Sequence, residues 1–185
     1  MNRYIAKWYE VITTKQVLVV TVVFLLFTAL VLPVVATFTA EQIGVSESPD
    51  TGFSFQLAGL YELLEAYGSS GRRLYILLRW TFDVVWPLTY TSFLVAATAY
   101  FGRRSRCRFG SRILYVPLMA MTMDFTENIF ATIVMAIYPT RIDLFGYLLF
   151  GASILKWTVL SLAFVLAFLL ATRFVVKRIQ GDIQP

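Results

Sequence analysis

Four long stretches of the chain are almost entirely apolar, and shorter polar segments separate them. They cover residues 17–37, 74–101, 113–138 and 144–172. A helix needs about 20 mostly apolar residues to cross the hydrocarbon core of a membrane, and each stretch reaches that length. The pattern predicts an all-α membrane protein, in which four transmembrane helices form a bundle with up-down-up-down order.

A shorter apolar stripe precedes the first span, in residues 1–16. Its members recur at helical spacing: Tyr4, Ile5, Trp8, Tyr9 and Ile12. The charged residues of the segment lie away from this stripe, and a helix of that kind rests in the membrane surface with its aromatic side chains at headgroup depth. The segment is predicted to be a short amphipathic helix at the cytoplasmic surface.

A second stripe of this kind lies in residues 38–73, between the first two spans. Leucine and tyrosine side chains share one helix face at positions Leu57, Leu60, Tyr61 and Leu64. Glu62 and Glu65 lie on another face of this helix. Gly68 is a typical stop signal and is predicted to end the helix at its C-terminal side. The sequence leaves two roles open for this outer helix, a surface element packed on the bundle or a lid over a cavity.

Basic residues are concentrated in the segments 1–16, 102–112 and 173–185, whereas residues 38–73 form an acidic segment with five Asp and Glu residues. Lys and Arg accumulate on the cytoplasmic side of membrane proteins, so both termini are predicted to face the cytoplasm. The turn at 139–143 then faces out. We expect one integral domain covering residues 1–185, in the cytoplasmic (inner) membrane of a prokaryote.

Composition narrows the possible chemistry. Of the 185 residues 58% are hydrophobic and only 15% are charged, which is too apolar for a soluble domain. The net charge of +5 sits in short segments beside the spans, so nucleic-acid binding is not expected. With no histidine and a single cysteine, Cys107, the chain offers no typical metal site, and no metal or cofactor is expected.

Five ionisable residues lie inside the spans: Arg79, Asp83, Asp124, Glu127 and Lys156. Charges in a membrane are costly, and by default they indicate a functional site. In the antiparallel order, Asp83, Glu127 and Lys156 all fall roughly 13–18 Å from the outer ends of their spans at 1.5 Å per residue. The sequence therefore predicts one buried charged cluster between the second, third and fourth spans.

Pairing within this cluster follows from spacing. Arg79 and Asp83 are four residues apart on one span, and Lys156 can reach Glu127 or Asp124 from the next helix. One acid is left over, and in apolar surroundings a carboxyl without a cation favours its protonated form. Further polar or aromatic residues extend the predicted site: Asn128 and Tyr90 in the cluster, and Trp86 and Trp157 lining a cavity. The alternative is that these charges only tie the helices together.

The phrases GRRLY, FDVVWPLTY, LYVPLMAMTMDFTEN and LKW occur in this order over residues 70–160. In these phrases the chain resembles a family of small bacterial four-span membrane proteins that has no assigned activity. The resemblance implies the four-span fold. Sterol isomerase-like four-span proteins also bury carboxylates and tryptophans, but none of their motifs matches here residue by residue, and such an analogy does not establish function.

Four functions are compatible with these residues. The first is binding of a small amphiphilic or lipid-like molecule from the outer side, with membrane lipids as the surroundings. The second is an intramembrane enzyme, such as a lipid isomerase, in which one carboxyl donates a proton and another removes one. The third is proton-coupled transport, for which four spans require a homo-oligomer. The fourth is an accessory subunit whose charges pair with those of a membrane-complex partner.

Overall fold

The computed structural model describes residues 3–45, 47–49 and 56–181, and within these ranges every regular element is a helix. Four helical stretches are long and apolar enough to cross a membrane: Thr14–Ile43, Gly68–Arg104, Gly110–Ile137 and Asp143–Ile179. This is the pattern of a multi-pass membrane protein. Most of the stretches extend beyond the apolar runs because polar residues continue the helices, whereas the third ends at Ile137, one residue before the predicted end.

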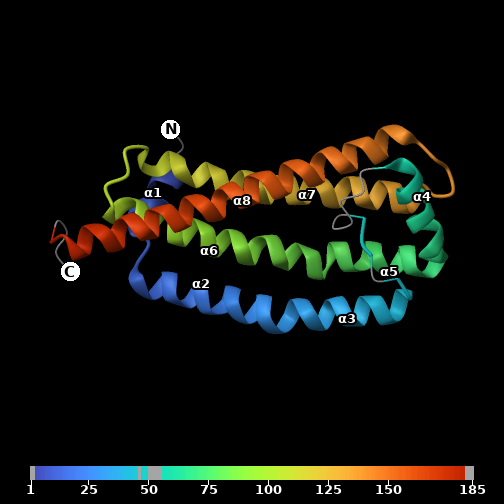
Figure 1. Cartoon of the computed structure of the whole chain (residues 1–185), viewed down its shortest axis with the longest axis horizontal. Coiled ribbons are helices and arrows are strands. Elements are labelled where there is room, and N and C mark those ends of the chain that lie inside the picture. The colour runs from blue at the N-terminus through green and yellow to red at the C-terminus, as the bar shows by residue number, and fades with distance from the viewer. Residues whose placement is uncertain (1–2, 46, 50–55, 182–185) are drawn as a thin grey trace. The chain divides into compact units, whose positions relative to one another are not determined.

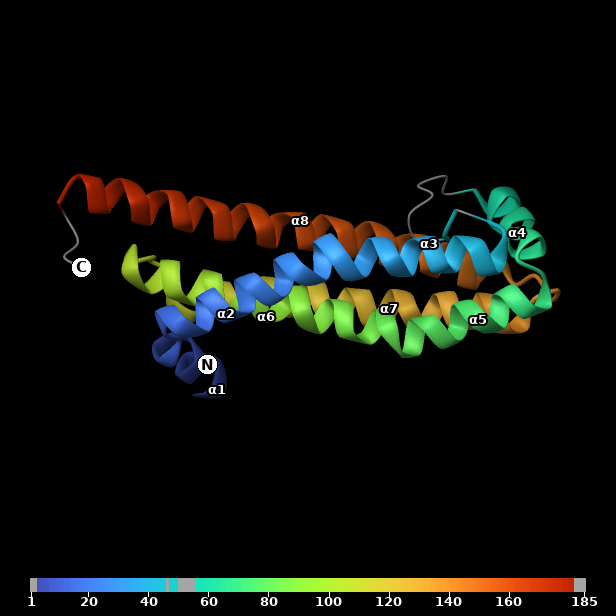
Figure 2. The same ribbon diagram turned by 90° about the horizontal axis from the view of Figure 1, so that it is seen from below.

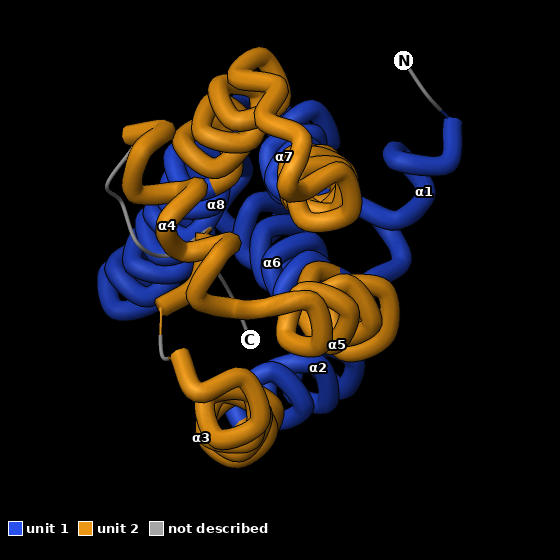
Figure 3. The backbone as a smooth tube through the Cα atoms, turned by 90° about the vertical axis from the view of Figure 1, so that its right-hand side faces the viewer, with its two compact units in different colours: residues 1–25, 88–121, 157–185 blue, residues 26–87, 122–156 orange. Residues whose placement is uncertain are grey.

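The chain divides into two compact units, coloured separately in Figure 3. Unit 1 comprises residues 1–25, 88–121 and 157–185, and unit 2 comprises residues 26–87 and 122–156. Three long helices contribute residues to both units: α6 (Phe82–Arg104), α7 (Tyr115–Ile137) and α8 (Asp143–Ile179).

Unit 1 holds the N-terminal helix α1 (Arg3–Val11) against the short 3-10 helix η2 (Gly110–Leu114). Ile5 and Tyr9 are buried in an apolar cluster with residues such as Ile113. Tyr4 and Trp8, which share the predicted stripe, are exposed in the chain itself. Figure 1 shows α1 next to the start of α2 (Thr14–Leu26), to which it is joined in sequence.

The first span changes its helical form in the middle. After α2 the backbone widens into a π-helix, η1 (Phe27–Val31), in which the N–H of Leu32 donates to the carbonyl of Phe27. Pro33 follows at once and has no N–H for the regular ladder, which favours such a local rearrangement. The span continues as α3 (Leu32–Ile43) and ends where Gly44 adopts a left-handed conformation with φ 75°.

Unit 2 contains α3, α4 (Leu57–Ala66) and α5 (Gly68–Trp80), together with parts of α6, α7 and α8. In Figures 1 and 2, α4 lies across the end of this unit and α3 runs beside α5. α4 buries the predicted face through Leu60, Tyr61 and Leu64, and Gly68 ends it with a positive φ of 61°. The sequence prediction of a stop at Gly68 is confirmed.

The second span contains an interruption that the sequence did not predict. α5 ends at Trp80 and α6 begins at Phe82, with Thr81 between them at φ −118° and ψ −78°. The hydroxyl of Thr81 donates to the carbonyl of Leu77 at 2.7 Å, which stabilises the last turn of α5. The helix axis can therefore change direction at Thr81, which lies between the charged residues Arg79 and Asp83.

Candidate functional site

The five ionisable residues predicted to lie in the spans all belong to unit 2, where four helices supply them. Arg79 stands in the last turn of α5, and Asp83 stands in the first turn of α6. Asp124 and Glu127 come from α7, and Lys156 comes from α8. Four of the five side chains are almost completely buried, whereas the side chain of Asp83 is 21% exposed.

Ion pairs join these residues into one chain. Arg79 Nη1 lies 2.6 Å from Asp83 Oδ2 and 3.7 Å from Glu127 Oε2. Lys156 Nζ donates to the same Glu127 Oε2 and lies 3.9 Å from Asp124 Oδ1. The order is Asp83, Arg79, Glu127, Lys156 and Asp124, so acids and bases alternate and an acid stands at each end. We call this the ion-pair chain.

Asn128 and Tyr75 complete the surroundings of Arg79. Asn128 Oδ1 accepts a hydrogen bond from Arg79 Nη1 at 2.8 Å, and its Nδ2 lies 3.5 Å from the backbone carbonyl of Asp83. The hydroxyl of Tyr75 accepts from Arg79 Nη2, and the guanidinium carbon lies 4.8 Å from the centre of the Tyr75 ring. Asn128 therefore contacts both sides of the helix junction, and Tyr75 holds the guanidinium from its own helix.

Tyr75 was missed by sequence reasoning, although its spacing carried a signal. It precedes Arg79 by four residues on α5, so the two side chains share a helix face. Tyrosine is common near the interface ends of membrane spans, so its residue type alone did not indicate a hydrogen bond to Arg79.

The helix junction at Thr81 suits the charges beside it. Arg79 lies where the carbonyl groups of α5 end, and Asp83 lies where the N–H groups of α6 begin. A helix carries partial negative charge at its C-terminus and partial positive charge at its N-terminus, so each residue is stabilised by the helix end that it occupies. Interrupted membrane helices of this kind line binding sites in other membrane proteins.

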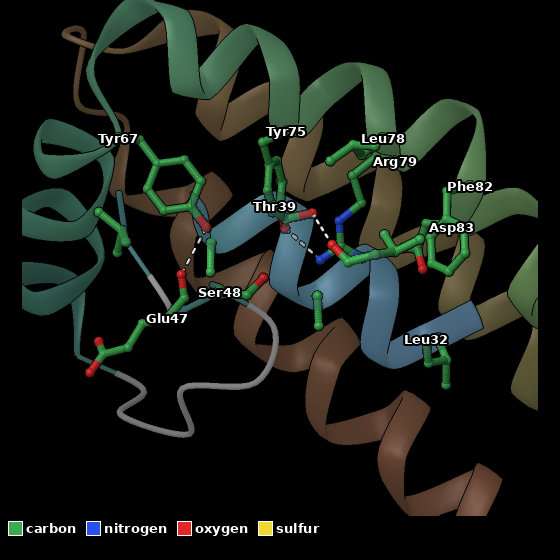
Figure 4. Close-up of a pocket in the computed structure, with 14 residues that line it drawn as sticks. Leu32, Thr39, Glu47, Ser48, Tyr67, Tyr75, Leu78, Arg79, Phe82 and Asp83 are labelled. Atoms are coloured by element: carbon green, nitrogen blue, oxygen red, sulfur yellow. Dashed lines mark hydrogen bonds and ion pairs between the residues drawn. The ribbon is translucent and has the colours of Figure 1, made fainter. Parts of the chain in front are cut away.

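A pocket of about 300 Å³ opens beside the Asp83 end of the ion-pair chain (Figure 4). One wall is α3, through apolar residues such as Leu32 and Val35. The opposite wall comes from α5 and the start of α6, where Leu78 and Phe82 stand next to Arg79 and Asp83. The pocket thus combines apolar walls with one charged corner.

The other predicted site residues have different surroundings. Tyr90 is fully buried and belongs to unit 1, as does the exposed Trp157. The Trp86 ring lies 5.7 Å from the ring of Phe27 in a stacked arrangement. None of these three residues is among those described as lining the pocket. Their assignment to the site stays a prediction.

The pocket also has a wall that sequence reasoning left out. The predicted cavity lay among the second, third and fourth spans, but α3 of the first span forms one side of this pocket. The apolar pattern of α3 resembles that of any lipid-facing helix, so it gives no indication of a pocket. Only the packing of α3 beside α5 makes it part of the site.

The ion-pair chain holds three carboxylates against two cations, so with all groups ionised it carries one negative charge in excess. Within the described ranges, no three His, Cys, Asp or Glu side chains are grouped as they would be around a metal ion. The charged residues of the chain, next to the apolar walls of the pocket, suit ionic and hydrogen-bonding contacts with a polar group.

No protein-family model, no curated protein and no solved structure matches this chain.

Proposed function

We propose that this membrane protein binds a small amphiphilic, lipid-like molecule in the pocket between α3 and α5. The observation that supports the proposal is the position of the pocket, whose apolar walls lead to the exposed end of the ion-pair chain. Small-molecule sites are concave, mostly apolar and equipped with a few placed polar groups. An amphiphile would lay its tail along Val35 and Leu78 and its polar group beside Arg79 and Asp83.

The access route follows from the loose packing of the first span. Only 6% of its most apolar window is buried inside the chain, compared with 50% for the second span. α3 exposes large apolar side chains at Val34 and Phe38, so in a membrane this part of the helix faces lipid tails. We infer that the ligand enters the pocket sideways from the bilayer, past α3.

Membrane orientation is part of the same proposal. Both termini face the cytoplasm, because basic residues gather near them and in the 102–112 loop. The burial of Ile5 and Tyr9, with Lys7 and Glu10 exposed, supports an amphipathic α1 at that surface. The pocket then lies toward the outer side, and α4 would cover the outer end of unit 2.

Protection of a cysteine in the pocket tests the proposal. Ala40 lines the pocket on α3, and its neighbour Glu41 does not. We would introduce A40C, or E41C as the control, with Cys107→Ser to remove the native thiol, and reconstitute each protein in phosphatidylcholine nanodiscs. Dodecyltrimethylammonium, dodecanol and dodecanoate would each be added before labelling with monobromobimane.

At least one of the three amphiphiles is expected to slow labelling of A40C and to leave E41C unchanged. A tryptophan at Val35, which lines the pocket, should abolish this protection, whereas a tryptophan at the adjacent, exposed Val34 should not. Equal labelling of A40C with and without all three compounds would overturn the proposal.

A further inference from the structure

We propose that the amphiphile is a cation, with an ammonium-type group that binds beside Asp83. This inference rests on the function proposed above and adds the charge of the ligand. It is carried by the order of charges in the ion-pair chain and by Asp83, the more exposed of the two chain members that line the pocket.

The alternation of charges sets the sign of the field in the pocket. The ion-pair chain begins at Asp83 and ends at Asp124, and each cation, Arg79 and Lys156, lies between two acids. A charge placed beyond the Asp83 end is closest to a carboxylate, and the next charge, that of Arg79, is farther away. Because Coulomb energy falls with distance, this end attracts a cation and repels an anion.

The exposed fractions of the side chains also favour binding of a cation at the Asp83 end of the ion-pair chain. The side chain of Asp83 is 21% exposed, and that of Arg79 is 6% exposed. Arg79 also lines the pocket, but its guanidinium already donates to Asp83, Asn128 and Tyr75. A ligand group in the pocket therefore meets the carboxylate of Asp83 before it meets the guanidinium.

The acids that line the pocket add a further reason. Charges taken out of water are stabilised when they are paired, so the carboxylate of Asp83 would stabilise a cation beside it. Glu47 also lines the pocket, and Figure 4 shows its carboxylate directed away from Asp83.

The aromatic lining can assist the binding of a cation. Tyr67 and Phe82 both line the pocket, and the face of an aromatic ring attracts ammonium groups. The hydroxyl of Tyr67 donates to the carbonyl of Glu47 at 2.8 Å, which fixes the position of its ring. A quaternary ammonium group is a suitable probe, because it keeps its charge at every pH.

The A40C protection experiment also tests which headgroup charge the pocket prefers, when its three ligands are compared at pH 7. They share a twelve-carbon tail and differ in the headgroup, which is cationic, neutral or anionic. Dodecyltrimethylammonium should half-protect A40C at a concentration at least about tenfold lower than dodecanol, as expected for one interaction with a charged group. Dodecanoate should be the weakest of the three.

Variants at Asp83 test whether this carboxylate causes the preference for a cationic ligand. Asp83→Asn should reduce the preference for the ammonium compound over dodecanol to less than about threefold, and Asp83→Glu, which keeps the charge, should retain it. If dodecanol or dodecanoate protects as well as the ammonium compound in the wild-type pocket, the cationic ligand is ruled out while the amphiphile site stands. If none of the three protects, the proposed function itself fails.

Discussion

Arg79 and Asp83 form an ion pair of 2.6 Å across the junction between α5 and α6. Their spacing of four residues suggests a contact along one continuous helix, but the two side chains lie on opposite sides of the irregular residue Thr81. The pair therefore connects two helix ends, and Asn128 joins both from α7.

Removal of the positive charge of Arg79 should strongly destabilise unit 2. Arg79→Gln leaves Asp83 and Glu127 without their shared cation, and such changes cost about 3–5 kcal/mol in buried pairs. Thermal unfolding in detergent micelles measures the loss. Arg73→Gln is the control, because Arg73 is exposed on the same helix and should change stability by less than about 0.5 kcal/mol. A small effect at Arg79 would contradict a tightly coupled cluster.

Glu127 and Lys156 should show strong energetic coupling. Lys156 Nζ donates to Glu127 Oε2, and both side chains are almost fully buried. Glu127→Gln and Lys156→Met each leave one buried charge without its main partner. The double variant should lose less stability than the sum of the two, by about 0.5–3 kcal/mol. Additive losses in a double-mutant cycle would show that the pair does not act as a unit.

Asn128 should contribute through its hydrogen bond to a charged group. Asn128→Ala removes the acceptor for Arg79 Nη1, and the expected loss is about 1.5–3 kcal/mol. Thr132→Val, one turn further along α7, removes the acceptor for Trp80 Nε1 at an exposed position and should cost less than about 1 kcal/mol. Chemical unfolding of the two variants side by side gives the comparison, and equal losses would contradict the special position of Asn128.

Arg103 should hold the N-terminal helix in place. Its guanidinium donates to the backbone carbonyls of Tyr9, Glu10 and Ile12, at the C-terminal end of α1. Arg103→Ala removes all three bonds, so hydrogen exchange across α1 should accelerate at least roughly tenfold, the effect of about 1.4 kcal/mol. Arg104→Ala removes a stacking contact with Tyr100 and should leave exchange in α1 unchanged.

The docking of α4 should weaken at high pH because of Tyr61. The Tyr61 hydroxyl donates to Asp143 Oδ1 at 3.0 Å, and burial, followed by this bond and the charge of Asp143, raises the pKa of Tyr61 above its usual 10.0. The folded state favours the protonated hydroxyl. Its contribution to stability is complete below pH 10 and is lost as the pH rises through the raised value.

Hydrogen exchange in α4 measures this effect. Exchange beyond the ordinary increase with pH should appear only above about pH 10, and Tyr61→Phe should remove the pH dependence while costing about 1 kcal/mol at pH 7. Tyr147→Phe is the control, because Tyr147 is mostly exposed. Loss of α4 protection well below pH 10 would contradict the role of Tyr61.

Particular residues show what the local pattern could reveal about the site. The apolar runs identified the spans, and the cost of burying charge indicated that Arg79, Asp83, Glu127 and Lys156 would be paired. The pairs Arg79–Asp83 and Lys156–Glu127 are confirmed. The roles of Tyr75 and Thr81 were not predicted, because a tyrosine or a threonine in a span has many ordinary uses.

The sequence by itself determined the helices and the presence of a charged cluster, since hydrophobic length and the cost of buried charge act locally along the chain. The tertiary structure decided which carboxylate is exposed. Asp83 lines the pocket, whereas α7 and its neighbours bury Asp124 and Glu127. It also made α3 a wall of the site. Exposure and proximity depend on helices that lie far apart in the sequence, and only their packing fixes which side chains share a space.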